Sequence, residues 1–584
     1  MKNHLGSKFR ILSLLITFFF QSSSPLLAAQ ASPPNILFIA LDDLNDWIGC
    51  LGGHPQTITP NLDRLAASGV LFTNAHCPGA ACNPSRTAIM SGLSPHRSGL
   101  YDNGQKMREI LPDAKIIPQH FRDHGYRASG SGKMLHYFID AKSWDEYFPK
   151  KELEDPFPFT LYPKKRPLSL TRGGPWQYVE TDWGPLDATD EEFGGDAKVA
   201  EWVSQQLSIK QEKPLFLACG FYRPHEPWFV PKKYFEPFPL EKIQLPPGYR
   251  EDDLDDLPAT GKKTGPNRYF AHIRNEGQWK QAIQGYLASI HFADTMLGRV
   301  LDALENGPNA DNTIVVLWSD HGWHLGEKQH WQKFTAWRAV TRVPLMIRIP
   351  KNCAPGLPAG TKPGTICDQP VNLLSLFPTL TQLTGIPHKN DNHAPSLAPL
   401  LKNHKSFWPH SSITHLGKPG SFGLSTKDWR YIHYANGDEE LYQIQDDPFE
   451  WTNLARKKEH REKLNELRAL APKNFAPLKR PSLAALPSLK WHSSNNTATP
   501  PSKPDGNPFT LTFLNRSDQA IELFWMTLEG KRTSYGLIPP GGNKSQQTRP
   551  GAVWQISSPK TKNPLGHFII GDRRAKAIIP KRSQ

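Results

Sequence analysis

Short apolar runs bounded by turn residues alternate with longer amphipathic stretches through the first four hundred or so residues. Four runs rich in Ile, Val, Leu and Phe are predicted to be buried strands: NILFIAL (35–41), PLFLACG (214–220), TIVVLWS (313–319) and VPLMIRIP (343–350). Apolar residues at helical spacing predict helices over 278–306 and 371–385. Strands that alternate with long helices indicate a doubly wound α/β sheet, whose active groups gather at the carboxyl ends of the strands.

The pattern changes at the end of this predicted α/β domain, which we assign to residues 32–400. Between 401 and 471, short polar strands precede a charged helix, which predicts a smaller α+β subdomain. Residues 472–507 are rich in Pro, Ser, Lys and Asn, a composition that buries little core and is typical of a linker. Strand-forming residues then alternate with turns over 508–584, so we expect a small β-sandwich there.

The first 31 residues have the pattern of a secretory signal peptide. Three basic residues precede an apolar run at 11–20, and small residues follow at 28–31. A membrane anchor would need an apolar stretch of about 20 residues, and neither this run nor any later one is long enough. We therefore expect an exported protein, periplasmic or secreted, with no stable membrane span.

The charge balance narrows the choice of partner. The 584 residues include 69 Lys and Arg against 55 Asp and Glu, for a net charge of +14. A positive excess suits a polyanionic substrate, although ordinary solvated surface charge explains it equally well. The basic residues are scattered and no nucleic-acid reading module occurs, so we expect no nucleic-acid partner.

Six cysteines are few for an exported chain of this length, and they exclude a disulfide scaffold. Cys353 and Cys367 flank a loop rich in Pro and Gly and are the candidates for a disulfide, which sequence alone cannot decide. If Cys82 is chemically altered, an odd number of thiols remains.

Acidic residues follow two of the predicted strands. Asp42 and Asp43 come directly after the first strand, and Asp320 and His321 come after TIVVLWS. Each pair alone is compatible with an ordinary turn or a structural contact. Two strands that end in such residues at one sheet edge favour a site for a hard cation, Ca²⁺ or Mg²⁺.

Cys82 opens the stretch CNPSRTAIMSG. Because proline is favoured at the first position of a helix, we expect Pro84 to begin one. Cys82 then lies at a helix N-terminus, where free amides and Arg86 attract anions. The same surroundings would stabilise a thiolate nucleophile, but no Cys-His-Asn pattern of the protease kind accompanies it.

This stretch resembles the sulfatase signature Cys-x-Pro-Ser-Arg, in which the cysteine is oxidised to formylglycine after translation. The resemblance runs from Asn35 to Leu454 and implies an alkaline-phosphatase-like fold and a formylglycine-generating enzyme as a maturation partner. It also implies a set of metal ligands for Ca²⁺, which are Asp42, Asp43, Cys82, Asp320 and His321.

Further family motifs follow in order. GKMLH resembles the family's Lys-x-x-His and provides Lys133 and His136, RPHEP provides His225, and HWQK provides Lys333. The pattern SDHGWxLGE is especially similar to the iduronate-2-sulfatase branch, and EELYQIQDDPFEWTNLA resembles a late family segment with Gln443 where an acid is common. Together these motifs favour an enzyme over an inactive binding protein.

The resemblance implies a mechanism in which the hydrated aldehyde at position 82 attacks the sulfur of a sulfated carbohydrate. Arg86, Lys133 and Lys333 would offset the charge on the sulfuryl oxygens. His225 is the candidate acid for the leaving alcohol, and His136 would orient or deprotonate the diol. Phosphate and phosphonate monoester hydrolases share these features and are the alternative.

The segment 508–584 resembles the von Hippel-Lindau β-domain, which binds hydroxyproline in a groove that uses Trp, Tyr, Ser and two His. The matching aromatic residues are Trp525, Tyr535 and Trp554. Gln547, Thr548 and Ala552 stand where His, Ser and His would be needed, so hydroxyproline binding does not follow. The tryptophans are equally consistent with ordinary core aromatics.

Overall fold

The computed structural model describes residues 33–150, 155–172, 180–350, 362–479, 483, 486–495, 497–504, 509–571 and 575–581. The predicted signal peptide and Cys353 lie outside these ranges. Cys367 is a buried free thiol. Within the described residues, the search for a helix long and apolar enough to cross a bilayer found none.

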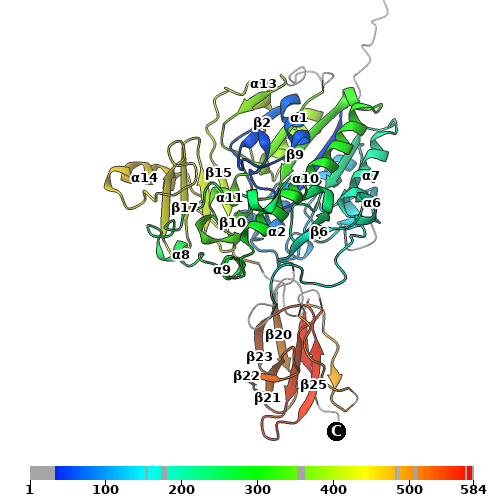
Figure 1. The fold of residues 1–584 in the computed structure, drawn as a ribbon, viewed down its shortest axis with the longest axis vertical. Coiled ribbons are helices and arrows are strands. Elements are labelled where there is room, and N and C mark those ends of the chain that lie inside the picture. The colour runs from blue at the N-terminus through cyan, green and yellow to red at the C-terminus, as the bar shows by residue number, and fades with distance from the viewer. Residues whose placement is uncertain are drawn as a thin grey trace, which may run out of the picture.

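An eight-stranded sheet forms the centre of the larger part of the molecule (Figure 1). In order across the sheet, the strands are β13 (Thr365–Cys367), β2 (Val70–Phe72), β12 (Leu345–Arg348), β9 (Thr313–Ser319), β1 (Asn35–Leu41), β7 (Leu215–Gly220), β4 (Arg127–Gly132) and β5 (Glu146–Phe148). Every residue of β1, β7 and β9 is buried, as their continuous apolar runs predict.

Helices cover both faces of this sheet, which confirms the predicted doubly wound α/β class. Leu37 and Ile39 of β1 pack in the cluster that includes helices α1 (Pro60–Ser68), α7 (Asp196–Leu207) and α10 (Trp279–Glu305). Ile36 and Phe38 point to the opposite cluster, with α2 (Cys82–Ser91), α5 (Ile117–Asp123) and α12 (Leu376–Thr384). The alternation along one strand thus divides the core into two layers.

Strand β12 runs antiparallel to its neighbours β9 and β2, whereas the other pairs of the sheet are parallel. The chain between β9 and β12 contains the short hairpin β10 (His324–Leu325) and β11 (Trp331–Gln332), with the 3-10 helix η6 (Glu327–Gln329) between its strands. The four-residue helix α11 (Arg338–Thr341) follows. This segment is not a crossover helix that returns the chain to the far edge. Residues 320–344 therefore stay at the edge where β1 and β9 end.

A second, antiparallel sheet follows, in the order β15 (Ser412–His415), β16 (Phe422–Ser425), β17 (Trp429–His433) and β18 (Glu439–Gln443). Helix α14 (Arg461–Ala469) packs on it through Leu464 and Leu467. These elements lie where the sequence predicts an α+β subdomain.

The C-terminal part has two facing sheets and lies at one end of the molecule (Figure 1). One contains β19 (His492–Ser493), β25 (Pro564–Ile569), β24 (Val553–Ser557), β21 (Ile521–Met526) and β22 (Arg532–Ile538), and the other contains β23 (Asn543–Thr548), β20 (Phe509–Asn515) and β26 (Lys576–Ile579). Strand β19 belongs to this sandwich although it falls within the stretch expected to be linker.

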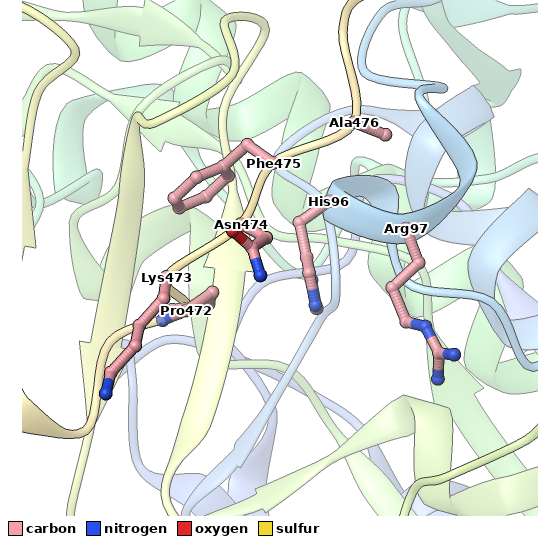
Figure 2. Close-up of a pocket in the computed structure, with 7 residues that line it drawn as sticks. All are labelled: His96, Arg97, Pro472, Lys473, Asn474, Phe475 and Ala476. Carbon is pink, nitrogen blue, oxygen red and sulfur yellow. The ribbon is translucent and has the colours of Figure 1, made fainter.

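The start of that stretch is bound to the large domain. The backbone N–H of Ala476 donates to the carbonyl of His96 in α3 (Pro95–Ser98), and that of Lys479 donates to Gly99. Figure 2 shows Phe475 and Ala476 passing beside His96 and Arg97. We call residues 475–479 the strap. The free part of the proposed linker is therefore shorter than the composition suggests.

Candidate active site

Acidic residues from two adjacent strands meet at the carboxyl edge of the sheet. Leu41 and Ser319 are in register, so the residues that follow them come together. The N–H of Asp43 donates to Oδ1 of Asp320 over 3.1 Å. Asp43 has a φ of 60°, a left-handed conformation that is costly for a non-glycine residue and is typical of functional sites.

Cys82 is the first residue of α2, as predicted, and Pro84 is the third residue of that helix rather than the first. One helical turn further on, Arg86 donates from Nε to Asp320 over 2.7 Å and from Nη2 to Asp42 over 3.0 Å. All three ionic side chains are fully buried. The guanidinium therefore fixes α2 to the carboxylates at the ends of β1 and β9.

Two lysines approach the sulfur of Cys82 from different elements. Nζ of Lys333, which follows β11, lies 3.0 Å from Sγ and 2.8 Å from Oδ1 of Asp43. Nζ of Lys133, which follows β4, lies 3.9 Å from Sγ and pairs with Asp42. Nε2 of His321 is 3.3 Å from the same sulfur. Cys82 thus sits in a buried, strongly cationic surrounding.

His136 and His225 line one small cavity beside this cluster, together with Lys333. Nε2 of His225 is 3.6 Å from Oδ2 of Asp43, and its Nδ1 faces the backbone carbonyl of Glu226. A hydrogen bond with Cys82 is among the influences that raise the pKa of His136, although burial dominates and lowers it. The structure therefore brings together all ten residues that the sequence singled out.

Comparison with known proteins identifies this arrangement. The model of the sulfatase family matches residues 34–386, and a curated protein described as a sulfatase, from Formosa agariphila, is 40% identical over 76% of this chain and 88% of its own length. The chain belongs to the sulfatase family. It is an enzyme that hydrolyses sulfate esters.

Other matches extend this assignment. The family model for the C-terminal part of N-sulphoglucosamine sulphohydrolase matches residues 326–473 of the sulfatase. Iduronate 2-sulfatase of Mus musculus is 32% identical over 60% of this chain and 69% of its own length.

Solved structures confirm the fold. A protein in complex with its substrate D-glucosamine-2-N,6-O-disulfate superposes with a TM-score of 0.57 at 22% identity, over 75% of this chain and 97% of the other. A phosphonate monoester hydrolase from Silicibacter pomeroyi gives 0.58 at 22% identity, over 75% and 94%.

The electrostatics of the sulfatase site follow from its burial and crowding. Burial alone would raise the pKa of Cys82, but the charges of Lys133, Lys333 and His321 outweigh it and hold the pKa well below the ordinary value. At Asp43 the balance is the opposite. Burial dominates and raises the pKa, although Lys333 and His321 oppose the shift. Burial also raises the pKa of Asp320, whereas Lys133 and Arg86 overcome burial at Asp42 and lower its pKa. Asp43 and Asp320 therefore remain short of positive charge.

This shortage is consistent with a bound cation. Asp42, Asp43, Cys82, Asp320 and His321 supply sets of donor atoms that lie within 4.8 Å of one another. Oδ2 of Asp43 has no hydrogen-bond partner although it is buried. Oxygen-rich sets of this kind fit Ca²⁺ or Mg²⁺. One of the sets includes His225, to which the sequence assigned proton transfer instead.

Several residues of the site escaped the sequence analysis. Glu226 and Gln332 line the same cavity as His225 and Lys333, and the rings of Tyr137 and Tyr222 lie 4.7 Å and 5.2 Å from Nζ of Lys133. Glu226 directly follows His225 in RPHEP, and Gln332 directly precedes Lys333 in HWQK. In the sequence, the feature that could have identified Glu226 and Gln332 is their position next to motif residues.

Proposed function

We propose that this sulfatase hydrolyses sulfate esters of sulfated carbohydrates through a formylglycine made from Cys82, with Ca²⁺ held by Asp42, Asp43, Asp320 and His321. The observation that carries the proposal is the convergence of Arg86, Lys133 and Lys333 on one buried carboxylate and cysteine cluster. A tetrahedral dianion or monoanion is the ligand that such a set of cations would accept.

In the proposed mechanism, the oxygens of the hydrated aldehyde lie where Sγ of Cys82 lies in the structure. The hydrated aldehyde supplies two hydroxyls on one carbon, one to attack the sulfur and one whose electrons re-form the carbonyl as sulfate leaves. A bound Ca²⁺ supplies Lewis acidity toward the sulfuryl oxygens. Lys333 and Lys133 stabilise the charge that grows there, because their ammonium groups already face position 82.

Proton transfer is assigned to the two cavity histidines. Burial, reinforced by Lys333 and Lys133, lowers the pKa of His225 to about 3, so the ring is neutral in the free enzyme. His225 can serve as the acid only after a bound sulfate adds negative charge beside it and raises this pKa. The leaving alcohol of a sugar needs a proton, and Nε2 of His225 is the ring nitrogen that faces the reaction site. His136 orients the diol through its hydrogen bond with position 82.

The carbohydrate part of the proposal and its placement in the iduronate-2-sulfatase-like branch are supported by relatives. Iduronate 2-sulfatase is among the similar curated proteins, and this chain carries the SDHGWxLGE pattern. The net charge of +14 suits a polyanionic substrate. Export to the periplasm or medium, after signal-peptide removal, and maturation by a formylglycine-generating enzyme belong to the same proposal.

A phosphate or phosphonate monoester hydrolase is the second candidate, because a phosphonate monoester hydrolase has a similar fold. Parallel assays on 4-nitrophenyl sulfate, 4-nitrophenyl phosphate and a phenylphosphonate monoester distinguish the two. We expect kcat/KM to be at least about tenfold higher for the sulfate. A preference for either phosphorus ester would overturn the proposed reaction.

The C-terminal sandwich is proposed to be a von Hippel-Lindau-like module. Trp554 is buried in its core, and the ring of Tyr535 meets it edge-on at 4.8 Å. The Nε1–H of Trp554 donates to Thr548. Since Trp554 serves the core and Gln547, Thr548 and Ala552 replace the groove residues, we do not extend hydroxyproline binding to it.

A further inference from the structure

A carboxylate that the proposed chemistry does not use lies in the active-site cavity. Glu226 is only 1% exposed and shares the cavity with His225 and Lys333. A carboxylate repels a sulfuryl group, so it cannot take part in binding the sulfate itself. Glu226 therefore either stabilises the fold or contacts the part of the substrate outside the sulfate group.

The contacts of Glu226 argue against a purely structural role. Its Oε1 accepts a hydrogen bond from Nε2 of Gln332 over 2.8 Å. Its Oε2 is buried, and within the described part of the chain it makes no hydrogen bond. Burial, reinforced by the charge of Glu180, raises the pKa of this carboxyl to about 8. Gln332, Lys333 and the hydroxyl of Thr181 oppose this shift. A buried oxygen without a hydrogen-bond partner lowers the stability of the fold unless a ligand forms a hydrogen bond with it.

Two neighbouring side chains hold the backbone of Glu226 in place. Its carbonyl accepts hydrogen bonds from the hydroxyl of Tyr222, over 3.0 Å, and from the ring of His225. Its partner Gln332 has a φ of 81°, and Phe334, which is 54% exposed at the same cavity, has a φ of 75°. Left-handed conformations of such residues are retained where function requires them. The Glu226–Gln332 pair is thus a fixed acceptor rather than a mobile side chain.

We propose that Glu226 is a specificity-determining residue that forms a hydrogen bond with a sugar hydroxyl on the carbon next to the sulfate ester. The proposal rests on the proposed function of the site. Glu226 is one residue from His225, which faces the leaving oxygen, and Gln332 is one residue from Lys333, which faces the sulfuryl group. The carboxyl group of Glu226 is therefore placed to contact the part of the sugar that adjoins the sulfate ester. A sugar hydroxyl can donate to the ionised carboxylate or accept from the protonated carboxyl, so it matches this side chain in either state.

The test uses substrates that differ by one hydroxyl. Wild-type enzyme is screened on methyl glycosides that each carry one sulfate, and the best of these is compared with its analogue that lacks the neighbouring hydroxyl. We expect the deoxy analogue to lose between about tenfold and about 100-fold in kcat/KM, the range for a hydrogen bond to a charged group. Glu226→Ala should lose as much on the parent sugar and show no further loss on the deoxy analogue.

Two further variants keep the result interpretable. Glu226→Gln has the same shape and cannot ionise, so it should fold at least as stably as wild type. It should still lose turnover of the parent sugar, because an amide replaces the carboxyl group that the hydroxyl contacts. Glu241→Ala, at an exposed position, should discriminate between the two sugars as wild type does.

The outcomes separate the two proposals. An equal penalty for the missing hydroxyl in wild type and in both Glu226 variants would overturn the role of Glu226, because the hydroxyl would then be recognised elsewhere. Equal losses by both Glu226 variants on 4-nitrophenyl sulfate and on the parent sugar would also overturn it. A wild-type enzyme that cleaves aryl sulfates but no sulfated sugar would instead refute the carbohydrate part of the proposed function, and the role of Glu226 with it.

Discussion

Nζ of Lys333 lies 3.0 Å from Sγ of Cys82. The same nitrogen is 2.8 Å from Asp43, so one cation bridges the residue proposed to form the nucleophile and a proposed metal ligand. This contact links the loop that follows β11 to the first residue of α2, which lies about 250 positions earlier in the chain. The assignment of charge stabilisation to Lys333 depends on this relationship.

Replacement of Lys333 by Ala should lower kcat strongly for a small aryl sulfate and for a sulfated oligosaccharide alike. The charge it stabilises develops in the transition state, and loss of one such donor costs about 10²–10³ in kcat. Steady-state kinetics on both substrates give the answer. Lys232→Ala, at an exposed position, is the control. A Lys333→Ala enzyme with normal kcat would remove this lysine from the mechanism.

Chelation should reduce activity and thermal stability together. Asp43 and Asp320 have raised pKa values because burial outweighs their cationic neighbours, so removal of a bound cation leaves them unfavourably crowded. At a hundredfold excess over Kd, a cation that binds only the folded state contributes about 3 kcal/mol. Tm and turnover are measured after exhaustive dialysis with a chelator and again after Ca²⁺ is restored. Full activity and unchanged Tm after dialysis would argue that no cation is needed.

Gln105 should connect the strap to the active-site helix. Its Nε2 donates to the carbonyls of Gly99 and Lys479, its Oε1 accepts from Tyr101 and Asp102, and its own carbonyl accepts from Asn83, the neighbour of Cys82.

Gln105→Glu keeps the two acceptor contacts but sets a buried carboxylate against two carbonyls, so we expect a lower Tm and a several-fold lower kcat. Lys479→Ala leaves its backbone carbonyl in place and is the matched control. If Gln105→Glu melts and turns over as wild type does, the strap does not support the site.

His415 should make the protein acid-sensitive. Burial and the charge of His96 lower its pKa to about 3, whereas in the unfolded chain it would titrate near 6.5. The unfolded state therefore gains protons first, and this contribution to stability is lost as pH falls from about 6.5 toward 3. Near pH 5 the loss is about 2 kcal/mol.

His415→Gln should therefore show a smaller drop in Tm between pH 7.5 and pH 5 than wild type does, with His460→Gln as the control. An identical pH dependence in all three proteins would show that the proton on His415 has no bearing on stability.

The sequence predicted the parts of the fold that depend on local pattern. The runs 35–41 and 313–319 coincide with β1 and β9, and the helix predicted over 278–306 is α10 (Trp279–Glu305). Because these strands are parallel neighbours, the residues after them could be assigned to one edge in advance. This argument identified the four residues that follow β1 and β9, and the helix N-terminus identified Cys82 and Arg86. The other four site residues, Lys133, His136, His225 and Lys333, could be named only from the resemblance to the sulfatases.

Features that depend on long-range contacts could not be read from local patterns. The antiparallel direction of β12 depends on where residues 320–344 lie in space. The strap depends on hydrogen bonds from Ala476 and Lys479 to residues 380 positions earlier, His96 and Gly99. The unpaired oxygen of Glu226 becomes visible only when its neighbours are in place.

The most direct test of the account concerns Cys82. Samples of the enzyme with different degrees of maturation are prepared, the aldehyde in the peptide that contains Cys82 is quantified by mass spectrometry after hydrazide labelling, and kcat for 4-nitrophenyl sulfate is measured on each sample. The account predicts that kcat rises in proportion to the aldehyde content, passes through zero when no aldehyde is present, and is abolished in a folded Cys82→Ala enzyme. Full activity in a sample with no aldehyde at position 82 would contradict it.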